Sequence, residues 1–123
     1  MYLTKNFNLE EFQCPCCGKT PDPESYEFKY FVGKLQDIRD LCKFPLHINS
    51  GFRCKKHNKS LPNSSPNSSH LIGLAVDIAI TNDFARLMFI RYAIECGIRR
   101  VGIGKTYIHV DTDFNKNDSI WLY

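Results

Sequence analysis

The segment from Ser68 to Asp77 constrains the fold more than any other part of the chain. It places His70 and Asp77 seven positions apart, with Gly73 between them. Apolar residues alternate after the glycine, which predicts a strand over residues 74–80 with Asp77 on the face opposite the larger apolar side chains. In an unbroken strand, the odd offset would point His70 and Asp77 to opposite faces. We therefore predict that His70 lies in a bend before the strand begins.

A second alternating segment, residues 107–113, carries His109 and Asp111 on one face. Two imidazoles and one carboxylate form a ligand set that Zn²⁺ accepts while it keeps a fourth position open for water. The candidate metal ligands are His70, Asp77 and His109. By spacing alone, the histidines could also be structural, and Asp77 could instead cap a loop or pair with Arg53.

The remaining apolar patterns predict an α+β fold. Recurrence at three- and four-residue intervals indicates a helix over residues 24–42, and Asn82 and Gly97 delimit a second helix over 83–96. A capped turn is expected after Asn8, and another helical turn at 55–61. Short strands are expected at residues 46–50, 74–80, 98–103 and 107–113, with the apolar tail 120–123 docking as a last strand. We expect a single domain over residues 1–123, in which a small antiparallel sheet packs against helices.

Length and charge exclude several classes of protein. The formal net charge of +3 over 123 residues is small, and the basic residues are scattered, so nucleic acid is not an expected partner. No apolar stretch approaches the roughly 20 residues of a membrane span. The N-terminus lacks the pattern of a signal peptide, which predicts synthesis in the cytoplasm. We expect a monomer.

The six cysteines are unevenly distributed. Cys14, Cys16 and Cys17 crowd together, whereas the other three lie singly. Without a signal peptide, reduced thiols are the expectation for all of them. A structural zinc site or a disulfide, with Cys54 as a partner, remains an alternative for the cluster. A redox or metal-handling role for residues 14–17 is a weaker hypothesis.

Three ordered blocks of the sequence resemble the zinc D-alanyl-D-alanine carboxypeptidase family, the M15 peptidases. The blocks are Ser50-Gly51-Phe52-Arg53, Ser68-x-His70-x-x-Gly73-x-Ala75-x-Asp77 and His109-Val110-Asp111. They fall in order, with matching internal spacing, over about residues 46–113. The opening stretch, residues 6–12, is also similar to that of a short subgroup often found in phage and bacterial genomes.

The resemblance implies an α+β domain of the D-Ala-D-Ala carboxypeptidase and Hedgehog type, with Zn²⁺ held by His70, Asp77 and His109. It implies hydrolysis of a peptide bond involving D-amino acids in peptidoglycan stem peptides, by a carboxypeptidase or endopeptidase that uses zinc-bound water. Arg53 would stabilise the oxyanion or grip a substrate carboxylate, unless it forms only a surface salt bridge. Ser68 would orient the substrate or serve only the turn. Because similar short members are often found in phage genomes, the resemblance also implies a phage-encoded protein that acts on the bacterial cell wall.

One position departs from the family pattern. Many members carry an acid three residues before the final histidine, as general base, and Thr106 stands there in this chain. Asp111 is the best substitute because it shares a strand face with His109, although it could instead orient that histidine. Without a base, the chain would bind zinc and be a poor enzyme. The alternative function is therefore a non-catalytic zinc-containing module that binds cell wall or belongs to a virion, as Hedgehog domains keep zinc while acting through partners.

Overall fold

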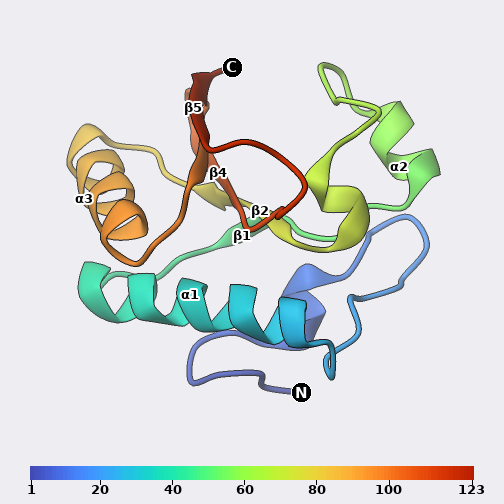
Figure 1. The fold of residues 1–123 in the computed structure, drawn as a ribbon, viewed down its shortest axis with the longest axis horizontal. Helices are drawn as coiled ribbons and strands as arrows, with labels where there is room; N and C mark the ends of the chain where they lie inside the picture. The colour runs from blue at the N-terminus through green and yellow to red at the C-terminus, as the bar shows by residue number, and fades with distance from the viewer.

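Five strands form one sheet, and the two long helices lie on one of its faces (Figure 1). The computed structural model describes residues 1–123. Across the sheet the strands follow the order β1-β2-β4-β3-β5. Their bounds are β1 (Ile48–Ser50), β2 (Ala75–Ala79), β3 (Arg100–Ile103), β4 (Tyr107–Asp111) and β5 (Ser119–Leu122). The predicted α+β fold class is confirmed.

The sheet is antiparallel through its first four strands and parallel at one edge. β2 pairs with β1 and β4, and β4 pairs with β3, all antiparallel. β5 pairs parallel to β3, so the expectation of an antiparallel sheet is wrong for this strand. Residues 112–118 cross from β4 to the far side of β3 at the end of the sheet where β4 ends and β3 begins. Ser119 N there donates to Arg99 O over 2.9 Å.

Local sequence explains both long helices. Ser25 Oγ caps α1 (Tyr26–Cys42) by accepting a hydrogen bond from Phe28 N over 3.3 Å. Asn82 Oδ1 caps α3 (Asp83–Glu95) by accepting from Ala85 N over 2.8 Å. Both helices lie within one or two residues of their predicted bounds. The apolar stripe of α1 is buried as expected, and its members are Phe28, Phe31, Val32, Leu35 and Ile38.

The hydrophobic core lies between these helices and one face of the sheet. Val76 and Ile78 of β2, and Ile108 and Val110 of β4, are fully buried in it. Burying one such aliphatic side chain contributes roughly 1.5–3 kcal/mol to folding. Because side chains alternate along a strand, the residues between them must point to the opposite face. That second face carries the candidate site.

Three short helical segments connect the sheet to its surroundings. They are η1 (Leu9–Phe12), α2 (Lys55–Ser60) and η2 (Ser69–Ile72). Asn8 and Glu11 form a capping box at η1, as expected of a capped turn.

All six cysteines are free, and Cys14 is buried. None of the helices combines the length and the apolar character needed to cross a membrane.

Candidate metal centre

A single helical turn places His70 at the mouth of β2. Ser68 Oγ accepts a hydrogen bond from His70 N over 3.2 Å, which caps η2. Gly73 ends the turn with a left-handed φ of 74°, which a residue with a side chain rarely adopts. The bend before the strand is therefore confirmed. It turns the imidazole of His70 back over the face of the sheet that carries Asp77.

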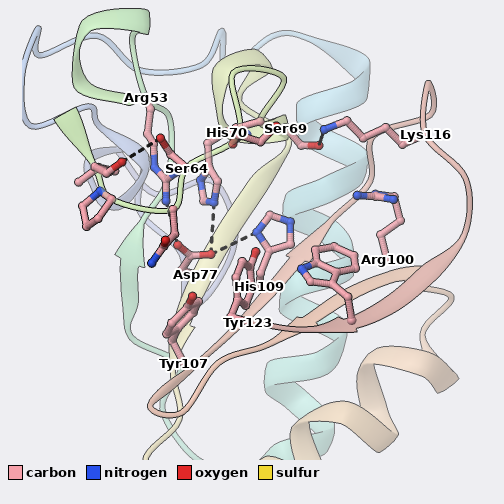
Figure 2. A pocket seen from close by; sticks show the side chains of 16 residues that line it. Arg53, Ser64, Ser69, His70, Asp77, Arg100, Tyr107, His109, Lys116 and Tyr123 are labelled. Carbon is pink, nitrogen blue, oxygen red and sulfur yellow. Dashed lines mark hydrogen bonds and ion pairs between the residues drawn. The ribbon is translucent and has the colours of Figure 1, made fainter. Parts of the chain in front are cut away.

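Strand register brings the other two predicted ligands together. Asp77 of β2 lies directly opposite His109 of β4 in the antiparallel ladder. Asp77 Oδ1 is 3.2 Å from His70 Nε2 and 3.2 Å from His109 Nδ1. Figure 2 shows this carboxylate between the two imidazoles. The three ligand atoms all lie within 4.8 Å of one another, so residues 7 to 39 positions apart in the chain form one cluster.

A backbone carbonyl determines which nitrogen of His70 faces the cluster. His70 Nδ1 lies 2.7 Å from Gly51 O. A carbonyl oxygen only accepts hydrogen bonds, so Nδ1 must carry the proton in this contact. In the neutral ring, Nε2 therefore presents a lone pair toward Asp77. Burial lowers the pKa of His70 and outweighs the opposing effect of Asp77, which favours this neutral form.

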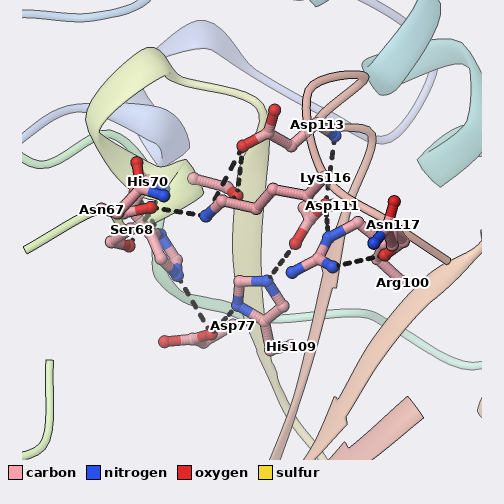
Figure 3. Close-up of polar contacts among 12 residues, drawn as sticks. Asn67, Ser68, His70, Asp77, Arg100, His109, Asp111, Asp113, Lys116 and Asn117 are labelled. Atoms are coloured by element: carbon pink, nitrogen blue, oxygen red, sulfur yellow. Dashed lines mark hydrogen bonds and ion pairs between the residues drawn. The ribbon is translucent and has the colours of Figure 1, made fainter. Parts of the chain in front are cut away.

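A carboxylate orients the second imidazole from behind. His109 Nε2 is 2.6 Å from Asp111 Oδ2, on the opposite side of the ring from Asp77 (Figure 3). Arg100 Nε donates to the other oxygen of Asp111 over 2.9 Å. Burial raises the pKa of Asp111, but its hydrogen bond with His109 and the nearby charges have a larger, opposite effect. The pKa is therefore lowered, and the carboxyl is ionised. His109 is thus directed to present Nδ1 to the cluster.

The donor set fits a divalent cation. Burial raises the pKa of Asp77, yet the imidazoles of His109 and His70, when they are protonated on the nitrogens that face it, hold it well below its usual range. An anionic oxygen and two imidazole nitrogens therefore converge in a buried place, where electron-rich atoms repel one another without a cation or a proton between them. Tetrahedral Zn²⁺ with bonds near 2.05 Å separates its ligand atoms by about 3.3 Å. The two 3.2 Å separations match that spacing.

Arg53 holds the remaining oxygen of Asp77. Its Nη2 donates to Asp77 Oδ2 over 3.0 Å, and Nε and Nη1 donate to Ser50 Oγ and Asn58 Oδ1 over 3.0 and 3.2 Å. Both partners of the ion pair are largely buried, with side chains 11% and 13% exposed. This is not a surface salt bridge. Buried Asn58 completes the arrangement by donating to Ser65 O over 2.8 Å, a role that sequence reasoning did not assign to it.

A cavity of about 760 Å³ opens over the three ligands. Arg53, Arg100 and Lys116 give its lining a positive character, and residues 63–65 and 68–69 supply small polar side chains. Asp77 is the only acidic residue among those that line it. Thr106 is exposed and does not line the cavity. Asp111 likewise does not line it, because it lies buried behind His109.

Aromatic residues that sequence reasoning did not single out form the opposite wall. Trp121 of β5 packs on His109 with ring centroids 5.3 Å apart, and Tyr123 packs on Tyr107 at the same separation. Burial raises the pKa of Tyr123 to about 12, so this phenol is a hydrogen-bond donor at neutral pH. Trp121 and Tyr123 reach the cavity because β5 pairs with β3, a long-range contact without a local sequence signal.

Ser68, the two remaining histidines and Ser69 have clear positions. Ser68 lines the cavity as well as capping η2, so its geometry is compatible with both roles considered for it. His47 is exposed on β1's approach, and His57 lies half-buried in α2. Neither contributes to the cluster. Ser69 is buried and donates to Asp113 Oδ2 over 2.7 Å, which ties η2 to the end of β4.

Comparison with known protein families agrees with this geometry. The family model for peptidase M15 matches residues 5–111, which include all three candidate ligands and Arg53. The chain belongs to the M15 peptidase family. No curated protein matches this chain. Membership of this family suggests a peptidase, for which peptides are the corresponding class of substrate.

Proposed function

We propose that this M15 family member is a zinc-dependent peptidase that hydrolyses a bond involving D-amino acids in peptidoglycan stem peptides, as a carboxypeptidase or a related endopeptidase. One observation carries the proposal: His70 Nε2, Asp77 Oδ1 and His109 Nδ1 converge at the base of a cavity. Two imidazoles and one carboxylate leave a coordination position open, as catalytic zinc sites do. Bound there, Zn²⁺ would supply a Lewis acid that activates water and polarises the scissile carbonyl.

The chain's own residues would prepare and hold the substrate. A cavity of about 760 Å³ is of the size that accommodates a short peptide. Its positive lining favours a peptide with a free carboxylate, which stem peptides carry. Arg53 uses three of its five N–H groups on protein partners, so two remain for a substrate oxygen. We assign Arg53 a double role, in which it positions Asp77 and stabilises negative charge on the substrate.

Of the two roles considered for Asp111, the geometry favours positioning over proton transfer. Its oxygens are occupied by His109 and Arg100, and it does not line the cavity. A general base must reach the proton it abstracts directly or through one water. We therefore assign Asp111 the task of orienting His109 and raising its basicity as a ligand.

A non-catalytic cell-wall binding module is the second candidate function. The observation that favours it is the lack of any carboxylate other than Asp77 among the cavity-lining residues. Thr106, which stands where many relatives carry an acid, is exposed outside the cavity. A protein of this kind would hold metal and grip wall peptides without cutting them.

Metal analysis combined with a cleavage assay tests both functions. Purified protein is incubated with peptidoglycan, with and without a chelator, and newly released amines are quantified. The peptidase predicts chelator-sensitive release that zinc restores and that His70→Ala abolishes. Zinc binding and peptide binding without amine release would favour the binding module. Release that persists in chelated, zinc-free protein would reject the metal-dependent mechanism.

A further inference from the structure

A second group of metal-binding side chains lies outside the cavity. The Sγ atoms of Cys14, Cys17 and Cys54 fall within 4.8 Å of one another. The first two belong to a Cys-x-x-Cys stretch directly after η1, and the third is the N-cap of α2, 37 positions further along the chain than Cys17. In Figure 1 the loop after η1 reaches the start of α2. None of these thiols has a place in the proposed peptidase mechanism.

Backbone N–H groups converge on these sulfurs. Cys54 N donates to Cys14 Sγ over 3.4 Å, and His57 N donates to Cys54 Sγ over the same distance. The N–H groups of Cys16 and Cys17 also face the Cys14 sulfur. Hydrogen bonds of this kind favour a thiolate over a thiol. They outweigh burial and lower the pKa of Cys14 to about 7.

The loop itself is closed around the first cysteine. Cys14 N donates to Lys19 O over 2.8 Å, and Gly18 N donates to Cys14 O over 2.9 Å. Gly18 adopts a left-handed φ of 76°, which permits the tight return of the chain. The thiol of Cys16 contacts that of Cys54 at the edge of the group. Cys16 lies outside the group of three whose Sγ atoms fall within 4.8 Å of one another, but its sulfur is beside that of Cys54.

We propose that Cys14, Cys17 and Cys54 bind a structural Zn²⁺ ion, with Cys16 as the fourth ligand. Thiolates select Zn²⁺ over harder cations, and four protein ligands close a site to substrate. Each cysteine that binds releases its thiol proton to solvent. This site shares no ligand with the His70 cluster, and the proposal does not depend on the proposed peptidase activity.

The position of the thiol site gives it a structural role. Cys54 directly follows Arg53, whose N–H donates to His70 O over 3.1 Å. Phe52 N donates to Phe12 O over 2.9 Å, two residues before Cys14. A metal ion held by both segments would therefore fasten the N-terminal loop to the stretch that supports the cavity. Loss of this ion should loosen that stretch without removing any ligand of the first centre.

Cobalt substitution tests the proposal on the intact chain. Reduced, metal-free protein is titrated with Co²⁺, and absorption is followed in the near ultraviolet, where thiolate-to-cobalt charge transfer appears. A histidine and carboxylate site gives no such band. We expect the band in the wild type and in His70→Ala, and its loss in Cys17→Ser. Cys17 is exposed, so its replacement leaves the core intact. Cys96→Ser, outside the cluster, is the matched control and should keep the band.

Metal stoichiometry supplies the second measurement. After zinc loading and desalting, elemental analysis should find two zinc ions per wild-type chain and one in either His70→Ala or Cys17→Ser. A wild-type protein that binds cobalt without the charge-transfer band would overturn the thiol site, whatever the variants do. So would a mass measurement showing that two of these cysteines form a disulfide in freshly purified protein. Failure of peptidase activity alone would leave this proposal unaffected, because the absorption band reports only on thiolates.

Discussion

Nε2 of His109 lies 2.6 Å from Oδ2 of Asp111, on the side of the imidazole that faces away from Asp77. The two contacts use both nitrogens of the ring, so its orientation and its tautomer depend on Asp111. His70 achieves the same result with a neutral partner, Gly51 O. The two histidines are therefore prepared for a cation by different means, one by a buried charge and the other by the backbone.

Asp111→Asn should weaken metal binding. The amide keeps the size of the carboxylate but loses its charge, so we expect zinc affinity to fall about 10- to 100-fold, as for other partners of ligating histidines. Competition with a chromophoric chelator measures this directly. Asp118→Asn, at an exposed ion pair, should leave the affinity unchanged. If zinc affinity were unaffected while the cleavage rate fell by more than about 100-fold, Asp111 would be the general base after all.

Gly51→Ala should destabilise the fold and disturb His70. A Cβ at this position would lie 2.7 Å from the backbone Cα of Phe12, which is too close for both segments of backbone to remain in place. We expect a loss of about 1–3 kcal/mol in the free energy of unfolding, measured in urea. Gly33→Ala is the matched control, since nothing lies within 4 Å of its added Cβ.

The control, Gly33→Ala, should raise the free energy of unfolding instead of lowering it. Gly33 lies inside α1, where alanine is more favourable than glycine by roughly 0.5–1 kcal/mol. Zinc affinity should fall in Gly51→Ala because the carbonyl that orients His70 moves, and it should stay constant in Gly33→Ala. Equal stability of the two variants would show that the close approach of Gly51 to Phe12 is absent in solution.

Arg53→Lys should reduce activity although it preserves the charge. Lysine lacks the planar fork that reaches Ser50, Asn58 and Asp77 together. We expect zinc affinity or the cleavage rate to fall roughly 10- to 100-fold. Arg91→Lys alters an exposed pair with Glu95, so it should behave as the wild type. A fully active Arg53→Lys enzyme would mean that a point charge suffices at this position.

Cys42 should react slowly with alkylating agents at neutral pH. Burial raises the pKa of its thiol to about 11 from a reference value of 9.0. Because the thiolate is the reactive form, roughly 100-fold less of it is present at pH 8 than for an unperturbed cysteine. The rate, followed by peptide mass spectrometry, should rise about tenfold per pH unit until the pH approaches 11. A rate that levels off near pH 9 would contradict this assignment.

Local patterns predicted the elements that carry the site. The stripe of α1, the bend at His70 and the alternation around His109 depend on residues close together in sequence, where helix and strand periods are visible. The clustering of His70, Asp77 and His109 could also be anticipated, because the resemblance to the M15 peptidases implied that all three bind one metal ion. Their role as metal ligands stays a prediction that metal analysis must test.

Long-range pairing determined what the sequence could not reveal. The partners of Arg53 come from β1, α2 and β2, and no spacing rule links Ser50, Asn58 and Asp77. The choice between two roles for Asp111 depended on which face of His109 it contacts, a matter of side-chain rotamer. The parallel edge made by β5 depended on the path of residues 112–118. Each of these features follows from packing between segments distant in the chain.

The C-terminal residues place part of the cavity lining outside the span that matches the family. Trp121 and Tyr123 line the cavity, yet both lie outside residues 5–111, which match the family model. The ligands, in contrast, all lie within it. A relative that shares the matched span need not share this aromatic wall, so its substrate preference does not transfer to this chain. Grafting or exchanging the last five residues would accordingly be a means of altering which peptides are accepted while the metal ligands stay untouched.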